Sequence, residues 1–352
     1  MKLGDISVSY IDIVIKAMHE LGYNIDDILK NFLLSKESLS SPDARVSIAK
    51  FMRLGHACIS KSKTPWFGLV MGKVTSPTQL GFAGVLADSS DNVEQVCHSL
   101  ATYEALNMYN IRGQSKFNDS LLGNGELVSF PKQNHQRGIL QFYSITPYND
   151  YNYFVVDSII SGWYKIITSL CNRNDAIEKV CFEFPAPKYE HRYREYFNCD
   201  VMFNQPNNYL VVKQEALSWT CKNACSSTFT LLQRYADGEL NKFQLGQSFQ
   251  EKVSRAIGPL LNGCTPTLER VAEQLNMAPW TVRRKLIDDG SSYQFTLNET
   301  RKELAISYAC DTALTLGEIA YLLGFGSPTA FQRAFKRWTG LAPGQFRQNH
   351  RK

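Results

Sequence analysis

Apolar residues near the amino end of the chain recur with the period of a helix. Between residues 8 and 21 they fall at spacings of three and four, and Gly22 follows where such a helix would end. Similar runs continue to about residue 60. From 64 to 87, glycines interrupt the apolar residues, which predicts loops and close helix packing. The apolar residues of the first run are Val8, Ile11, Val14, Ile15, Met18 and Leu21.

The middle of the chain has the shorter period of strands. Residues 138–145, 179–184 and 208–212 are rich in β-branched and aromatic side chains and predict strands. A helical stretch at about 155–171 lies between the first two. This mixture predicts an α+β fold with a mostly antiparallel sheet and several helices.

A helical period returns from 216 to about 240. Its apolar stripe consists of Phe229, Leu232 and Tyr235. A stripe of this kind fits a dimer contact and fits packing against its own domain equally well. Both interpretations stay open at this point.

A polar stretch separates this helix from the rest of the chain. Residues 237–248 contain two glycines, and regular apolar spacing resumes after them. We therefore expect an α+β sensing and dimerisation domain over 1–240, a linker over 241–249 and an all-helical domain over 250–352.

The last hundred residues contain an internal repeat. The segment 267–275 aligns with 315–323, which lies 48 residues later. Each begins with a threonine suited to cap a helix, and leucine, valine or isoleucine, alanine and leucine follow at i, i+3, i+4 and i+7. Thr315 has Glu318 three residues later and predicts a capping box, which the first copy lacks.

A second helix is expected after each copy, beginning at Pro279 or at Ser327. Its buried residues correspond at an offset of 49, because the second turn is one residue longer. The small Ala272 and Ala320 allow two helices to cross closely, as in a helix-turn-helix. The pattern predicts two tandem helix-turn-helix units. The corresponding residues of the second helices are Val282 with Phe331, Leu286 with Phe335 and Arg284 with Arg333.

A further helix, over about 293–310, is expected to join the two units. Phe295, Leu304, Ala305 and Tyr308 are its packing residues. Such a helix is roughly 25 Å long. This length suits two recognition helices in successive segments of the major groove, about 34 Å apart.

Charge supports the same interpretation. The chain has a net charge of +5, and residues 250–352 hold 14 of its Lys and Arg residues against 9 of its Asp and Glu residues. The preceding residues balance, with 24 of each sign. A neutral region joined to a basic one is typical of a sensor attached to a module that binds a polyanion.

Several other classes of protein are disfavoured. The amino end carries an early acid and no signal-peptide pattern, and no apolar run approaches the ~20 residues of a membrane span. The nine cysteines are scattered without a C-x-x-C pair, so we expect reduced thiols and no metal site, with a thiol redox switch as the alternative. Neither a phosphate-binding glycine loop nor a catalytic set is present, so we expect no cofactor and no enzymatic activity.

The sequence resembles the AraC/XylS family of transcriptional regulators. The upstream part is similar to the arabinose-binding-type amino-terminal domain found in one branch of that family, at 22–25, 65–69, 81–84 and 196–203. The carboxyl-terminal residues that carry the resemblance are 267–286, Gly290, 301–305, 319–325, 330–338, Gly340, Pro343, Phe346 and Arg347.

The resemblance implies two recognition helices with defined contacts to DNA. Arginine pairs with guanine and glutamine with adenine, whereas Trp or Thr contacts a thymine methyl. Buried packing is the alternative for Trp280, and a phosphate contact or a solvated charge is the alternative for Arg283 and Arg333. The family's base-reading positions are Trp280, Arg283, Arg284, Thr329, Gln332 and Arg333 here. Those suited to phosphate contacts are Thr281, Lys285, Ser327, Lys336 and Arg337.

Two features depart from the family pattern. Ala278 stands where a serine cap is usual, and Pro279 and Pro328 begin the second helices. Proline is compatible with a first helical turn, so these departures affect the bases that are read and leave the fold intact.

The effector-binding residues cannot be assigned from the sequence. For each residue that invites attention in the amino-terminal domain, a structural role is favoured over a ligand contact. These residues are Tyr103, Arg112, Tyr143 and Trp163, as candidates for a pocket lining, and His135 and His191.

The resemblance further implies a cytoplasmic regulator, more often an activator, that a small-molecule effector controls. Its expected partners are double-stranded promoter DNA, RNA polymerase and a second copy of the chain, with no membrane. In the alternative hypothesis, the amino-terminal domain is a protein-interaction or oligomerisation module without a ligand.

Overall fold

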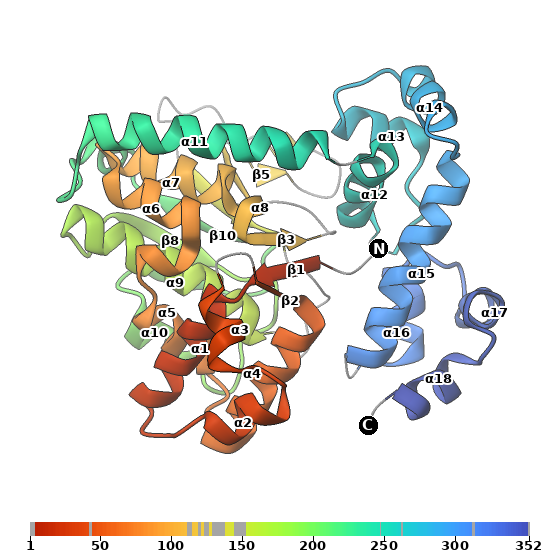
Figure 1. Ribbon diagram of the computed structural model, residues 1–352, viewed down its shortest axis with the longest axis horizontal. Coiled ribbons are helices and arrows are strands. Elements are labelled where there is room, and N and C mark those ends of the chain that lie inside the picture. Colours follow the sequence, from red (N-terminus) through yellow and green to blue (C-terminus); the bar gives the residue numbers. More distant parts are fainter. Residues whose placement is uncertain are drawn as a thin grey trace.

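The computed structural model places helices on both sides of a central sheet and a separate helical group at one end (Figure 1). It describes residues 4–41, 44–110, 115–118, 121–122, 127–128, 138–143, 153–246, 248–261, 263–311 and 314–350.

The first part of the chain is mainly helical, as the periodicity predicts. Gly22 has a φ of 79°, a left-handed conformation that ends the first helix. Apolar faces of these helices enter the large core. The helices are α1 (Ser9–Glu20), α2 (Asp26–Asn31), α3 (Lys36–Ser40), α4 (Ile48–Ser62), α5 (Phe67–Val74), η1 (Pro77–Leu80), α6 (Gly81–Ser89), α7 (Val93–Thr102) and α8 (Glu104–Asn107).

Glycines let α5 approach α9 (Tyr153–Cys171), the central helix of the domain. A Cβ atom on Gly68 would lie 2.4 Å from the carbonyl oxygen of Phe154, and one on Gly72 would collide with the hydroxyl of Ser161 at 1.8 Å. The expected close helix packing in this region is therefore confirmed.

A five-stranded sheet lies against α9. Its order is β4-β7-β10-β8-β9, with antiparallel pairs except for the parallel pair of β8 and β9. The mostly antiparallel α+β fold is thus confirmed. The predicted strand at 138–145 is described as a strand only to Phe142. The strands are β4 (Lys116–Asn118), β7 (Gly138–Phe142), β8 (Ile177–Cys181), β9 (Asp200–Met202) and β10 (Asn208–Val212).

A second, three-stranded sheet was not predicted. It joins β1 (Gly4–Ser7) antiparallel to both β2 (Arg45–Ser47) and β3 (Met108–Asn110). The remaining elements of this part are β5 (Leu121–Leu122), β6 (Leu127–Val128), α10 (Glu190–Tyr196) and η2 (Gln214–Ser218).

Helix α11 (Ser226–Leu245) runs along the first region towards the helical group (Figure 1). Phe229 and Leu232 pack against a buried cluster that includes Ala83 and Leu86 of α6, so this part of the stripe contacts its own domain. Tyr235 is 60% exposed and its ring contacts Phe82. The helix continues through Leu245, over half of the segment expected as a linker.

The described residues after 248 form helices and turns. The predicted packing residues of α15 are buried except Phe295, which is 53% exposed and for which the prediction was wrong because it lies on the outer face. Within the described residues, no helix is long and apolar enough to cross a membrane. The helices are α12 (Phe249–Leu260), α13 (Leu268–Gln274), α14 (Pro279–Asp288), α15 (Tyr293–Asp311), α16 (Leu316–Leu322), α17 (Pro328–Thr339) and α18 (Pro343–His350).

Candidate nucleic-acid interface

The first repeated unit consists of α13 and α14. Thr267 caps α13 by accepting a hydrogen bond from the backbone N–H of Arg270 at 3.4 Å. Ala272, Val282 and Leu286 are fully buried between the helices. The small alanine lets the backbones approach, as the sequence predicts for a helix-turn-helix.

The second unit, α16 and α17, repeats this arrangement with a better cap. The hydroxyl of Thr315 accepts from the N–H of Glu318 at 3.2 Å, and the Glu318 carboxylate accepts from the N–H of Thr315 at 2.7 Å. The predicted capping box is therefore present here, and in the first unit it is absent. Ala320 is 1% exposed, and Phe331 and Phe335 are fully buried.

The repeat extends to the backbone of the turns. Met277 donates its N–H to the carbonyl of Ala272 at 2.9 Å, and Phe325 donates to Ala320 at 2.9 Å. The residue before each donor has a positive φ, 50° at Asn276 and 67° at Gly324. These are the features of a helix that ends in a left-handed residue. The two units thus correspond at a sequence separation of 48 residues up to and including this turn.

The face of α14 that points away from the core carries the predicted base-reading side chains. Trp280 is 65% exposed, so the alternative of a buried aromatic is excluded. The guanidinium of Arg284 lies 5.3 Å from the centre of the Trp280 ring, at cation–π distance. Arg283 and Lys285 are also exposed, and Thr281 is half-buried.

Helix α17 presents a similar face. Thr329, Gln332 and Arg333 are exposed along it, and Lys336 and Arg337 extend the exposed positive charge over its last turn. Ser327 is half-buried and caps the helix by accepting a hydrogen bond from the N–H of Ala330 at 3.2 Å. Its hydroxyl proton stays available to an anionic oxygen.

Arg301 of the joining helix α15 fixes the position of the second unit. It is 7% exposed, and its guanidinium donates to the carbonyl oxygens of Leu323 and Gly324, both at 2.8 Å, and to the hydroxyl of Thr265 at 2.6 Å. Burial lowers the pKa of this guanidinium. Because Leu323 and Gly324 end α16, Arg301 stabilises the turn before α17. The sequence pattern alone did not indicate this role.

At the other end of α15, Arg347 of α18 forms a similar set of hydrogen bonds to backbone carbonyl oxygens. Its guanidinium donates to the carbonyls of Ala309 at 3.0 Å and Leu314 at 2.6 Å. The interface is therefore held by two half-buried or buried arginines, whereas the arginines on α14 and α17 are exposed to solvent.

The candidate residues of the first region lie in different places. Trp163 lines a cavity among helices, and Tyr103 is buried with its hydroxyl donating to Asp237 at 2.6 Å. Tyr143 lies at the sheet, half-buried, and His191 is exposed on α10. Arg112 and His135 lie outside the described residues.

The cavity contains two residues that sequence reasoning missed, Tyr10 and Glu104. Burial raises the pKa of the Glu104 carboxyl to about 7, although hydrogen bonds from Ser115 and the charge of Arg255 act in the opposite direction. Tyr10 and Glu104 lie 94 positions apart in the sequence, and no local pattern connects them.

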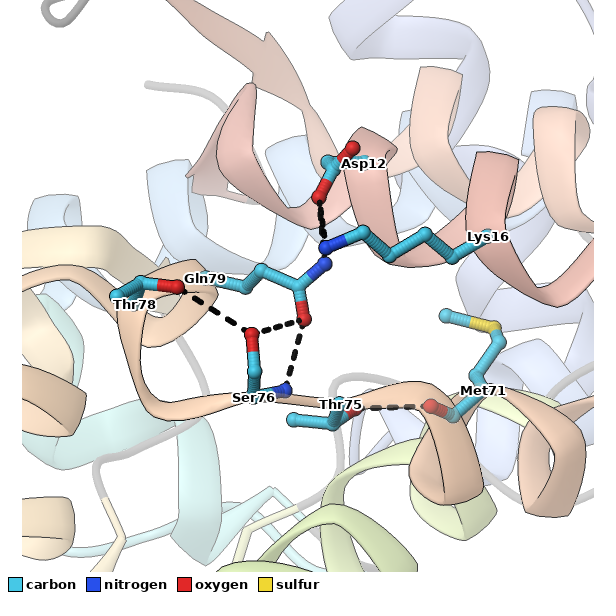
Figure 2. Close-up of polar contacts among 7 residues, drawn as sticks. All are labelled: Asp12, Lys16, Met71, Thr75, Ser76, Thr78 and Gln79. Atoms are coloured by element: carbon cyan, nitrogen blue, oxygen red, sulfur yellow. Dashed lines mark hydrogen bonds and ion pairs between the residues drawn. The ribbon is translucent and has the colours of Figure 1, made fainter. Parts of the chain in front are cut away.

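Helix η1 is joined to α1 beside this cavity. Figure 2 shows Gln79 of η1 accepting from the N–H of Ser76 at 2.8 Å while its amide donates to Asp12 of α1 at 2.6 Å. Lys16 pairs with the same carboxylate at 2.9 Å. These bonds join two of the helices that line the cavity, η1 and α1.

The cysteines form no disulfide, and five of the nine are buried. Cys225 is exposed just before α11, where hydrogen bonding with Ser227 and Thr228 lowers the pKa of its thiol to about 7. Among the described residues, no group of three His, Cys, Asp or Glu side chains is placed to hold a metal ion.

Comparison with known families gives two matches in this chain. Residues 22–221 match the family described as the arabinose-binding domain of AraC transcription regulator, N-term. Residues 271–349 match a helix-turn-helix domain family. Together the two matches cover both regions of the fold.

Individual proteins are similar over nearly the whole chain. The ornithine utilization regulator of Pseudomonas aeruginosa is 27% identical over 97% of this chain and 96% of its own length. The HTH-type transcriptional regulator VirS of Mycobacterium tuberculosis is 23% identical, over 94% of this chain and 92% of its own. The crystal structure of the transcriptional regulator CdpR from Pseudomonas aeruginosa aligns with a TM-score of 0.39 and 19% identity, covering 93% of this chain and 98% of that one.

Proposed function

Because this chain belongs to the AraC family of DNA-binding transcription regulators, we propose that it is a sequence-specific activator controlled by a small-molecule effector in its amino-terminal domain. The observation that carries this proposal is the pair of equivalent helices, α14 and α17, whose outer faces are polar and basic. We assign effector sensing to 1–240, DNA binding to 250–352 and the connection to 241–249.

The two helices α14 and α17 each contact one segment of the major groove. Trp280, Arg283 and Arg284 of α14 read base edges in one segment of the major groove. Three side chains of α17 read the second segment, namely those of Thr329, Gln332 and Arg333. Phosphate contacts from Thr281, Lys285, Ser327, Lys336 and Arg337 set the register of the protein on the duplex.

The proposed partners follow from this role. The protein binds double-stranded promoter DNA in the cytoplasm and contacts RNA polymerase there. It acts as a homodimer, for which the exposed Leu231 and Tyr235 of α11, 68% and 60% exposed, offer an apolar contact. The exposure of these two side chains supports this contact.

Substitution of single arginines tests the reading helices. In the full-length protein, Arg283→Ala and Arg333→Ala should each weaken binding to the selected site by about 1–3 kcal/mol and relax the base preference at one position. Selection from a random DNA library followed by fluorescence anisotropy measures both effects. Arg194→Ala on α10 removes an arginine that is also exposed but lies away from both helices, and it serves as the control.

Lys336→Ala tests the phosphate contacts in the same assay. It should weaken binding to all sequences alike and reduce the slope of log K against log salt by about one. Unchanged affinity in both arginine variants would show that α14 and α17 are not the reading helices. A change of base preference in Lys336→Ala would show that this side chain reads bases.

The second candidate function keeps DNA binding and makes the first domain a protein-interaction module without a ligand. The exposed Leu231 and Tyr235 favour it. A thermal-shift screen separates the two, because a small molecule that binds the folded state raises the melting temperature.

A further inference from the structure

The outer face of α14 carries an aromatic ring among polar and charged side chains. Trp280 is 65% exposed, whereas Val282 and Leu286 of the same helix are fully buried on its inner face. A side chain so exposed contributes little to the packing of the unit. The contacts that Trp280 can make therefore lie on the outer face of α14.

The structure places the guanidinium of Arg284 over this ring. The central carbon of the guanidinium lies 5.3 Å from the centre of the Trp280 ring. The two residues are four positions apart on α14, so their side chains lie one above the other on the same face of the helix. A cation over an aromatic ring is attracted by the negative charge of the π electrons. The contact therefore restricts the Arg284 side chain before DNA is present.

The contact leaves the hydrogen-bond donors of Arg284 free. The guanidinium is planar, and its N–H groups point outward within that plane. A ring that faces the plane occupies none of them, and the structure gives Arg284 an aromatic partner, not a carboxylate. Guanine presents its N7 and O6 atoms together in the major groove, where one guanidinium can donate to both. Trp280 can therefore position Arg284 while Arg284 binds guanine.

The second unit provides a comparison within the same chain. At the offset of 49 between α14 and α17, Thr329 takes the position of Trp280. Arg333 takes the position of Arg284 and is also exposed. Threonine has no ring, so Thr329 cannot position Arg333 in the same way. The chain thus contains two equivalent arginines, one with an aromatic neighbour on its own helix face and one without.

A ring beside an arginine that binds guanine also comes close to the next base pair. One helical turn rises about 5.4 Å, and successive base pairs are about 3.4 Å apart along the duplex. Side chains one turn apart on a helix in the major groove can therefore reach adjacent base pairs. Thymine is the base that presents a methyl group there, and an apolar side chain can contact it.

Building on the proposed role of α14 as a reading helix, we propose that Trp280 is a positioning residue for Arg284 and that the two side chains together read a guanine beside a thymine. The ring of Trp280 directs the guanidinium towards N7 and O6 of the guanine, and its edge contacts the thymine methyl. The preferences at these two base pairs are coupled, because both depend on one ring. Arg333 has no such ring, so the preference at its base pair is independent of the neighbouring one.

A double-mutant cycle tests the positioning role. Fluorescence anisotropy measures binding of the full-length protein to a selected site in which deoxyuridine replaces the thymine, so that no methyl contact contributes. Trp280→Ala should weaken binding about two- to fivefold when Arg284 is present and should have no effect in Arg284→Ala. Trp280→Phe, which keeps a ring, should restore most of the affinity. Equal losses with and without Arg284 would overturn the positioning role.

Restoring the thymine tests the methyl contact. Deoxyuridine differs from thymidine only by the missing methyl group. The parent protein should bind the thymine site about three- to fivefold more tightly than the uracil site, and Trp280→Ala should bind the two alike. Tyr321→Leu serves as the control, because it removes another exposed aromatic ring, from α16 outside both reading helices, and should preserve the methyl effect. A parent protein that does not distinguish the two sites would overturn the coupled reading.

The same assay separates this inference from the proposed function. Selective DNA binding that depends on Arg283 and Arg284 but shows no coupling between Trp280 and Arg284 would refute the inference and leave the regulator intact. Unchanged base preferences in both Arg283→Ala and Arg284→Ala would refute α14 as a reading helix, and with it the proposed function of that helix. The melting temperature of each variant checks that it is folded.

Discussion

At the scale of single residues, burial decides what a charged group can do. Glu104 and Arg283 are both ionisable, but one is enclosed by apolar helices and the other extends into solvent. Burial disfavours the charged form of a carboxyl group, whereas an exposed guanidinium keeps its charge for a partner. The same distinction separates Arg301, whose buried guanidinium joins α15 to the end of α16, from Arg333 on the exposed face of α17.

The raised pKa of Glu104 predicts a specific dependence of stability on pH. The pKa is about 7 in the folded protein against an ordinary 4.5. Between these values the folded state binds the proton more tightly than the unfolded state, so stability falls as pH rises through this window. The loss is about 3 kcal/mol, fully present above pH 7.

Glu104→Gln isolates this effect, because glutamine does not titrate. Urea unfolding of both proteins at pH 5 and pH 8 should show the variant gaining about 3 kcal/mol relative to the parent at the higher pH. A difference that is the same at both pH values would contradict the prediction.

At the scale of elements, the two units share a fold but differ in how their helices end. The left-handed position is Asn276 in the first unit and Gly324 in the second. Asn276 is exposed, whereas Gly324 lies against another segment: a Cβ atom on Gly324 would be 2.2 Å from the carbonyl oxygen of Cys264. Glycine is therefore required at 324 by space as well as by conformation.

We expect Gly324→Ala to destabilise the protein by about 2–4 kcal/mol, because it adds both left-handed strain and a backbone collision. Gly326→Ala, two residues later, has nothing within 4 Å of the added atom and a φ outside the left-handed region. It should change stability by less than about 1 kcal/mol. Chemical unfolding measures both, and equal effects would show that the contact with Cys264 is not required.

The elements also show which features a sequence can predict. The caps of α13 and α16, the buried alanines and the buried residues of α14 and α17 follow from local spacing, so they were predicted correctly. Strands β1 and β3 were not, because each has at most four residues and their pairing joins positions about a hundred apart. Phe295 was misassigned because α15 is enclosed by neighbours on several sides and has no single apolar stripe.

At the scale of the whole molecule, β3 connects the cavity to the helical group. Tyr109 follows Glu104 by five residues, and its ring contacts Phe243 of α11 at 5.8 Å. The guanidinium of Arg255, on α12, lies 5.2 Å from the centre of the same ring, and its charge acts on Glu104. A charged residue of the helical group therefore acts on a buried carboxyl group of the first region.

The cavity itself could not be predicted from the sequence. Its walls come from helices spread between residues 10 and 163. Tyr10 and Glu104 lie in segments whose pattern indicates only an ordinary amphipathic helix. Trp163 was considered as a pocket residue, and its place in the cavity lining depends on the packing of α9 against α5 and α7. Long-range packing of this kind has no periodic signature.

The junction between α11 and α12 bears on promoter architecture. Helix α11 ends at Leu245 and α12 begins at Phe249, so three residues separate them, a reach of roughly 10 Å. A protein with so short a tether cannot turn its first domain to the opposite side of the double helix. With the proposed contact to RNA polymerase, displacing the binding site by about five base pairs, half a helical turn, should rotate the whole regulator away from a polymerase bound alongside. The rotational phase of the site, more than its distance, is then the constraint on the promoters that this protein can serve.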